Sequence, residues 1–152
     1  MSRLVIVRCG KKKIWDGNPS AGPTRAKDAY TSPASQTYMR YADQLSDEWI
    51  ILSAKYGFID PDFVIPCNYN VTFENKSTNP LSIQELKQQV RDKRLGQFNE
   101  IEVLGGKCYA YHVQQAFSET KAKVLKPFEG IKGNGSMSQK VNQALRDGKP
   151  MT

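Results

Sequence analysis

Polar side chains that can do acid–base chemistry follow an apolar run in the middle of the chain. Within eight residues of its end lie four of them: Ser53, Lys55, Tyr56 and Asp60. The run, 49–52, is typical of a parallel strand that is buried on both faces. Ligands of open α/β sheets bind just beyond the carboxyl ends of such strands, so these residues are candidates for a functional site. The alternative is an ordinary polar turn, in which Gly57 adopts a positive φ angle.

A second cluster follows directly on the first predicted strand, 3–8. Its members are Cys9, Gly10, Lys11, Lys12 and Lys13. Three lysines at the carboxyl edge of a sheet can bind phosphate or a nucleic-acid backbone as point charges, although they also fit a solvated run of charge. Cys9 is either a nucleophile whose thiolate the lysines favour or a small buried residue.

Two further segments are candidates for binding phosphate because each runs into a helix. Asp28, Tyr30 and Ser32 precede a predicted helix, where backbone N–H groups favour an anion and Ser32 is expected to be the N-cap. The glycine-rich loop 130–136 leads into the last helix, and its candidate contacts are Lys132, Gly133 and Ser136. This loop is neither a P-loop nor a dinucleotide-binding fingerprint.

Alternating strands and helices must position these residues. Strands are predicted at 3–8, 48–53, 101–104 and 122–125. Helices are predicted to begin at Ser32-Pro33, at the capping box of Ser82, after Gly105-Gly106 and at the capping box of Ser136. Residues 9–28 and 60–80 are expected to be loops, with a short extended piece at 69–73. We therefore predict one α/β domain over residues 1–146, with a mainly parallel sheet between two helical layers, and a flexible tail at 147–152.

Composition narrows the classes of function. The 152 residues carry a formal net charge of +7, which favours a polyanionic partner such as DNA. Three widely spaced cysteines and one histidine do not form a zinc-binding pattern, so we expect no metal and no cofactor. No signal peptide and no apolar run near the ~20 residues of a membrane span is present, which predicts a cytoplasmic protein with reduced thiols and no membrane partner.

Several of these segments together resemble a little-characterised family of small bacterial and phage proteins. The resemblance is carried by residues 9–13, 29–33 and 52–61, and residues 69–73 and 105–109 continue it. Its most specific part is the sequence Leu-Ser-Ala-Lys-Tyr-Gly at 52–57.

The same core more distantly resembles the peroxide-stress protein YaaA, whose relatives resemble uracil-DNA glycosylases and the base-modifying domain of archaeosine synthase in fold. This resemblance implies a three-layer α/β/α domain, uracil-DNA glycosylase-like, that acts on nucleobases or binds DNA. Asn70 stands where members of the family tend to carry an acid. The glycosylases' own Gly-Asp-Pro-Tyr and His-Pro-Ser sequences are absent, so their mechanism is implied only by analogy of fold.

Our leading hypothesis is a monofunctional DNA glycosylase that hydrolyses the N-glycosidic bond of a plain or modified base. Such an enzyme holds an extruded base in a pocket and stabilises charge on the sugar and on the leaving base. Asp60 is expected to orient water, with Asn70 and Asp28 as alternatives, and Tyr30 or Tyr56 to stack on the base.

The remaining groups in this hypothesis contact DNA. Lys11 to Lys13 and Lys55 are expected to bind phosphates, and Phe128 or Met137 to wedge between bases. The residues expected to meet in one pocket are Cys9, Lys13, Tyr30, Ser53, Lys55 and Asp60. The alternatives are a DNA-binding stress-response protein without turnover and an enzyme that acts on a free nucleotide or nucleoside.

Overall fold

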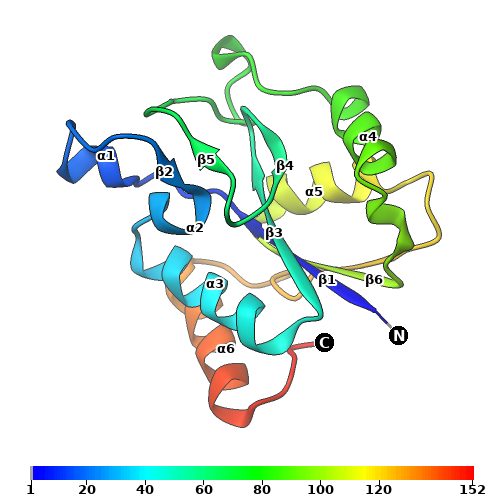
Figure 1. The fold of residues 1–152 in the computed structure, drawn as a ribbon. Coiled ribbons are helices and arrows are strands. Elements are labelled where there is room, and N and C mark those ends of the chain that lie inside the picture. Colours follow the sequence, from blue (N-terminus) through cyan, green and yellow to red (C-terminus); the bar gives the residue numbers. More distant parts are fainter. Residues whose placement is uncertain (1) are drawn as a thin grey trace.

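The central strand of the sheet is β1 (Arg3–Arg8), whose residues 4–7 are all apolar and buried. The computed structural model describes residues 2–152, and in them the sheet has five strands in the order β4-β3-β1-β6-β7 (Figure 1). The flanking strands are β3 (Glu48–Ser53), β4 (Gly57–Ile59), β6 (Glu100–Leu104) and β7 (Lys123–Leu125). β1 is parallel to β3 and β6, and β7 is parallel to β6. The prediction of an α/β fold with a mainly parallel sheet is therefore confirmed.

Two pairs of helices cover the two faces of this sheet (Figure 1). α3 (Pro33–Leu45) packs against α6 (Asn134–Asp147) on one face, and α4 (Ile83–Asp92) packs against α5 (Lys107–Ala116) on the other. Successive side chains of a strand point to opposite faces, so Val5 and Val7 enter the first core while Leu4 and Ile6 enter the second.

The predicted helix starts are confirmed at three places and wrong at a fourth. α5 begins at Lys107, directly after Gly105-Gly106, as predicted. Ser32 caps α3 and Ser82 caps α4, in each case by accepting the backbone N–H three residues on. α6 begins at Asn134, not at Ser136, and the Ser136 capping box does not form. Gly133 has a φ of 88°, a conformation open to glycine, and this lets the chain enter the helix earlier than the serine pattern indicated.

The long loop segments contain short elements that the sequence did not reveal. The segment 9–28 holds α1 (Ile14–Gly17), β2 (Thr24–Arg25) and most of α2 (Ala26–Ala29). β2 pairs with β5 (Val64–Ile65), and the segment 60–80 also holds the 3₁₀ turn η1 (Lys76–Thr78). A second 3₁₀ turn, η2 (Leu95–Gln97), follows α4. Residues 69–73, expected to be extended, form no strand.

β4 reverses the chain directly after the specific 52–57 segment. It runs antiparallel to β3, with Ile59 opposite Ile51, so Asp60 leaves the sheet back along β3 and away from Ser53. Gly57 permits this reversal because its φ is 80°. The polar turn was predicted correctly, but the short strand after it was not.

The last residues, which we expected to be a flexible tail, contact the body of the domain. The Met151 N–H donates to the Tyr41 hydroxyl at 3.0 Å, and the Thr152 hydroxyl donates to Glu102 at 2.8 Å. Glu102 is fully buried and also accepts from Tyr41 at 2.6 Å. Within residues 2–152, no helix combines the length and the apolar character needed to cross a membrane.

Candidate functional site

The carboxyl ends of β1 and β3 bring two of the predicted clusters together. Arg8 is in register with Leu52, and the Cys9 N–H donates to the Leu52 carbonyl at 3.0 Å. Cys9 and Ser53 therefore follow neighbouring strands at the same edge of the sheet, as their sequence positions predicted.

A chain of three buried hydroxyls lies at this edge. The Ser53 hydroxyl lies 2.9 Å from the Tyr69 hydroxyl, which lies 2.5 Å from that of Tyr30. Ser53 also accepts the backbone N–H groups of Lys55 and Tyr56, each at 3.2 Å, so its proton is free to go to Tyr69. Burial raises the pKa of both tyrosines well above the ordinary value, and both remain protonated at neutral pH.

Lys13 lies over this chain and differs from its two neighbours in sequence. It is only 7% exposed, whereas Lys11 and Lys12 are exposed. Its Nζ lies 4.6 Å from the centre of the Tyr69 ring and donates one hydrogen bond, to the Lys11 carbonyl at 3.3 Å. It forms no ion pair with a carboxylate of residues 2–152. Burial consequently lowers the pKa of Lys13 from the ordinary value of 10.5.

Cys9 lies beside the same groups. Its side chain is 7% exposed, and its sulfur lies 3.2 Å from the hydroxyl of Tyr109 on α5. Burial raises the pKa of Tyr109, so that hydroxyl keeps its proton and can donate to the sulfur. Cys9 is thus buried at the edge of the first hydrophobic core, where its sulfur meets a hydroxyl.

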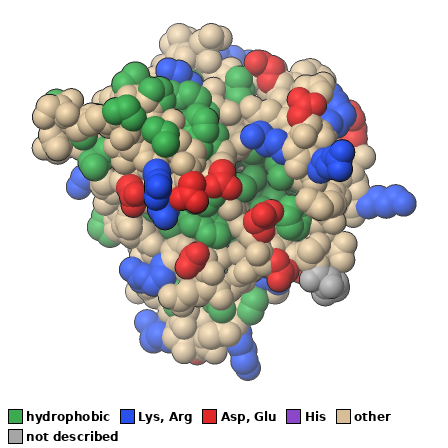
Figure 2. Space-filling view, viewed as in Figure 1, with side chains coloured by type: hydrophobic (Ala, Val, Ile, Leu, Met, Phe, Trp, Pro, Cys, Tyr) green, Lys and Arg blue, Asp and Glu red, His purple; other side chains and the backbone are tan. Residues whose placement is uncertain are grey.

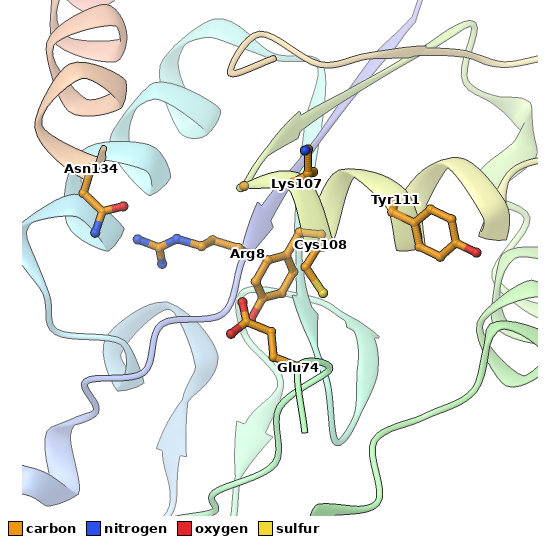
Figure 3. Close-up of a pocket in the computed structure, with 8 residues that line it drawn as sticks. Arg8, Glu74, Lys107, Cys108, Tyr111 and Asn134 are labelled. Carbon is orange, nitrogen blue, oxygen red and sulfur yellow. The ribbon is translucent and has the colours of Figure 1, made fainter. Parts of the chain in front are cut away.

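A cavity of about 710 Å³ opens above these residues. Its lining includes Cys9, Gly10, Lys11, Lys12, Lys13, Ser32, Asn70, Glu74 and Tyr109. A neighbouring cavity of about 640 Å³, shown in Figure 3, shares Arg8, Glu74, Tyr109 and Asn134 with the first, so the two adjoin. Volumes of this size are usual for small-molecule sites.

Arg8 gives the shared wall a positive charge. Figure 3 shows its side chain projecting from the end of β1 toward Asn134 at the start of α6. The guanidinium donates to Ser35 at 3.1 Å and lies 5.0 Å from the Tyr38 ring. The N-caps of α5 and α6 are Gly106 and Gly133, and no side chain in the described part of the chain caps either helix. Unsatisfied N–H groups and a guanidinium both favour an anion.

Two predicted carboxylates lie elsewhere. Asp60 and Asp28 are exposed and absent from the cavity lining, because β4 carries Asp60 down to α2, the helix that holds Asp28. The two segments are joined there by the Lys27 N–H, which donates to the Pro61 carbonyl at 2.9 Å, and by an ion pair between Lys27 and Asp62. Figure 2 shows acidic side chains gathered on this face around the turn between β4 and β5. A polyanion is not favoured there.

The aromatic residues assigned to base contacts are placed differently from our expectation. Tyr30 is 1% exposed and Phe128 is 4% exposed, so neither ring can stack on a base or wedge between bases. Tyr56 is half-buried between Phe63 and Tyr69, and Met137 packs against the core. Lys55 is exposed and lies 5.9 Å from the Tyr69 ring, near the site. Lys132, Gly133 and Ser136 do not line the cavity, although their neighbour Asn134 does.

Sequence reasoning missed four residues of the cavity wall: Arg8, Tyr69, Glu74 and Tyr109. Arg8 had a usable signal, because it is a charged residue at the end of an otherwise apolar strand. Tyr69 and Tyr109 fall in segments that carried the family resemblance, but single aromatic residues are usually explained by the core. Glu74 had no local signal.

Comparisons with known proteins agree with the little-characterised family. A family described as "Family of unknown function (DUF6884)" matches residues 4–142. "Uncharacterized protein YfjM" of Bacillus subtilis (strain 168) is 43% identical over 147 residues, which are 97% of each chain.

One solved structure is similar in fold. The crystal structure of AF0587, a protein of unknown function, has a TM-score of 0.51 and 14% sequence identity. The match covers 97% of this chain and 44% of that one, so the chain spans less than half the length of AF0587. None of these three matches is a YaaA protein or a uracil-DNA glycosylase, and that resemblance stays a prediction. With its match over nearly the whole length and a close bacterial relative, the chain belongs to the DUF6884 family.

Proposed function

We propose that this protein is an enzyme that removes a base from DNA by hydrolysing the N-glycosidic bond in the Cys9–Lys13 cavity. The observation that carries the proposal is the buried Lys13, which forms no ion pair within residues 2–152, beside an open cavity with a basic rim. A lysine with a pKa lowered by burial in a cleft is a candidate for acid–base chemistry. The uracil-DNA glycosylase-like fold that the sequence resemblance implies is part of the same proposal.

The rim suits a phosphodiester. Lys11 and Lys12 are exposed at the cavity, and the half-buried Arg8 lines both this cavity and its neighbour. Pro33 and Ala34, in the first turn of α3, also line the wall, so the positive end of that helix faces the same space. Phosphates on either side of an extruded nucleotide would meet these groups.

Cleavage of the glycosidic bond places positive charge on the sugar and negative charge on the departing base. Glu74, a carboxylate at the cavity, takes the role first given to Asp60: it stabilises the sugar cation and, with Asn70, orients the attacking water. The Lys13 ammonium gives its proton to the departing base. Burial lowers the pKa of Lys13 and therefore favours this proton transfer.

The test is base release from defined oligonucleotides. Duplexes with plain or modified bases are incubated with the protein, and alkali then converts abasic sites to strand breaks. Glu74→Gln should lower the single-turnover rate by about 10²–10⁴-fold at little cost in DNA affinity. Asp60→Asn, outside the cavity, should keep the parent rate. Tight DNA binding with no strand breaks on any substrate would leave the non-catalytic alternative.

The size of the cavity favours a second candidate, an N-glycosidase of free nucleotides. About 710 Å³ is enough for a single nucleotide without any DNA. Release of free base from a panel of mononucleotides, with no affinity for duplex DNA, would select this candidate over the first.

A further inference from the structure

Lys13 is positioned for a second chemical role. Its amine is buried, has one carbonyl as hydrogen-bond acceptor and lines the large cavity. Lysines that form Schiff bases share this situation, because a desolvated amine loses its proton more readily and is then a nucleophile. Lys11 and Lys12, by contrast, are exposed to solvent.

We propose that Lys13 condenses with the sugar aldehyde of an abasic site in DNA and holds it as an imine. The inference rests on the proposed function for the identity of its substrate. Removal of a base leaves a sugar whose ring-opened form carries an aldehyde at C1′. Once Lys13 has protonated the departing base, the neutral amine is left in the same cavity as this aldehyde.

The condensation needs no oxidant, reductant or co-reactant. The Nζ lone pair attacks C1′ and the carbonyl electrons move to oxygen, which takes up a proton. The carbinolamine then loses that oxygen as water, and the C1′=Nζ double bond forms. Amine and aldehyde thus give imine and water.

Groups beside Lys13 can supply the protons. The hydroxyls of Tyr69 and Tyr109 belong to residues that line the cavity, and burial raises the pKa of both so that both keep their protons. Tyr69 is connected to Ser53 through a 2.9 Å hydrogen bond, which can replace a proton that Tyr69 gives up.

Borohydride trapping tests the proposal independently of base removal. An oligonucleotide with a preformed abasic site is mixed with the protein and sodium borohydride, which reduces an imine to a stable amine cross-link. We expect a cross-linked band, and peptide mass spectrometry should place the adduct on Lys13. An oligonucleotide whose abasic site is a tetrahydrofuran, which has no aldehyde, should give no band.

Two variants test whether trapping depends on the amine of Lys13. Lys13→Arg keeps the positive charge but has no amine nucleophile, and it should lower trapping at least 10-fold. Lys27→Arg, a matched exchange of an exposed lysine on the acidic face, should trap as the parent does. If Lys13→Arg does not fold, the position of the adduct in the parent protein still tests whether Lys13 forms the imine.

An adduct on the terminal amine or on other lysines, or undiminished trapping by a folded Lys13→Arg, would overturn the inference. Trapping on Lys13 without base release from any DNA would support the inference and count against the proposed function. Base release without trapping would support the proposed function and overturn the inference. The two proposals therefore fail separately.

Discussion

Replacement of Lys13 by methionine should stabilise the protein while it abolishes any chemistry of the amine. Methionine has nearly the same length, so it fills the space of a side chain that is only 7% exposed. It loses one hydrogen bond to the Lys11 carbonyl and the approach to the Tyr69 ring. It also removes a buried charge that has no ion pair within residues 2–152 and only the longer-range attraction of Asp16.

The lowered pKa of Lys13 indicates that the cost of burying its charge is larger than the gain from its contacts. Burial outweighs the favourable interactions of the ammonium, including the attraction of Asp16, so the charged form is disfavoured in the folded protein. We expect a gain of about 1 kcal/mol in the free energy of unfolding at pH 7, the usual size of the effect of a single substitution. For a domain of this size that is a rise of about 2–4 °C in Tm.

The gain should depend on pH in a defined direction. Between the lowered pKa of folded Lys13 and the ordinary value of 10.5, the unfolded chain binds more protons than the folded one, so the parent protein becomes more stable relative to the variant as pH rises. The difference in Tm should therefore be largest near neutral pH and shrink toward pH ~10.

Thermal melts at pH 6 to 10 measure this difference. Lys12→Met, the exposed neighbour, is the matched control and should change stability by less than about 0.5 kcal/mol at any pH. A clear fall in the Tm of Lys13→Met at pH 7 would show that the contacts with Tyr69 and Lys11 outweigh burial. Our reading of Lys13 as a destabilised group would then be refuted.

Two more predictions concern the rim and the core. Replacing Lys11 and Lys12 together by alanine should flatten the slope of log DNA affinity against log salt by roughly 1.4–1.8, as measured by fluorescence anisotropy, and an unchanged slope would assign them to a merely solvated surface. Glu102→Gln should lower the free energy of unfolding, measured by urea titration, by about 2–4 kcal/mol, because Arg3 and the hydroxyls of Tyr41 and Thr152 lose a buried carboxylate. Parent-like stability would mean that hydrogen bonds, without the charge, are enough to hold this network.

The parallel core of the fold could be predicted from the sequence because its signals are local. The apolar runs of β1 and β3 and the serine caps of α3 and α4 each depend on a few adjacent residues. Once two parallel strands are neighbours, the loops after them must share an edge, which is why Cys9 and Ser53 could be placed together.

Sequence could not predict that Glu74 lies at the cavity and that Asp60 does not. The position of Asp60 depends on β4, a strand of only three residues that reverses the chain. Nothing in Gly57-Phe58-Ile59 distinguishes an antiparallel edge strand from the continuation of a turn, and that strand carries Asp60 to the opposite side of the loop. Glu74 reaches the cavity from a loop without regular structure. Its position is set by long-range packing, which a local sequence pattern cannot predict.

The two buried charged side chains among residues 2–152 provide the strongest argument that the cavity is a functional site. Glu102 accepts hydrogen bonds from Tyr41 and Thr152 and is paired with Arg3 at 3.6 Å, so its burial is compensated and a structural role explains it. Lys13 has one carbonyl and an aromatic ring. A buried ammonium with so few partners lowers stability, and an apolar side chain of the same length would serve the packing better. Proteins break such local rules chiefly at functional sites, and here a buried charge without an ion pair lines an open cavity beside three tyrosine hydroxyls and a cysteine.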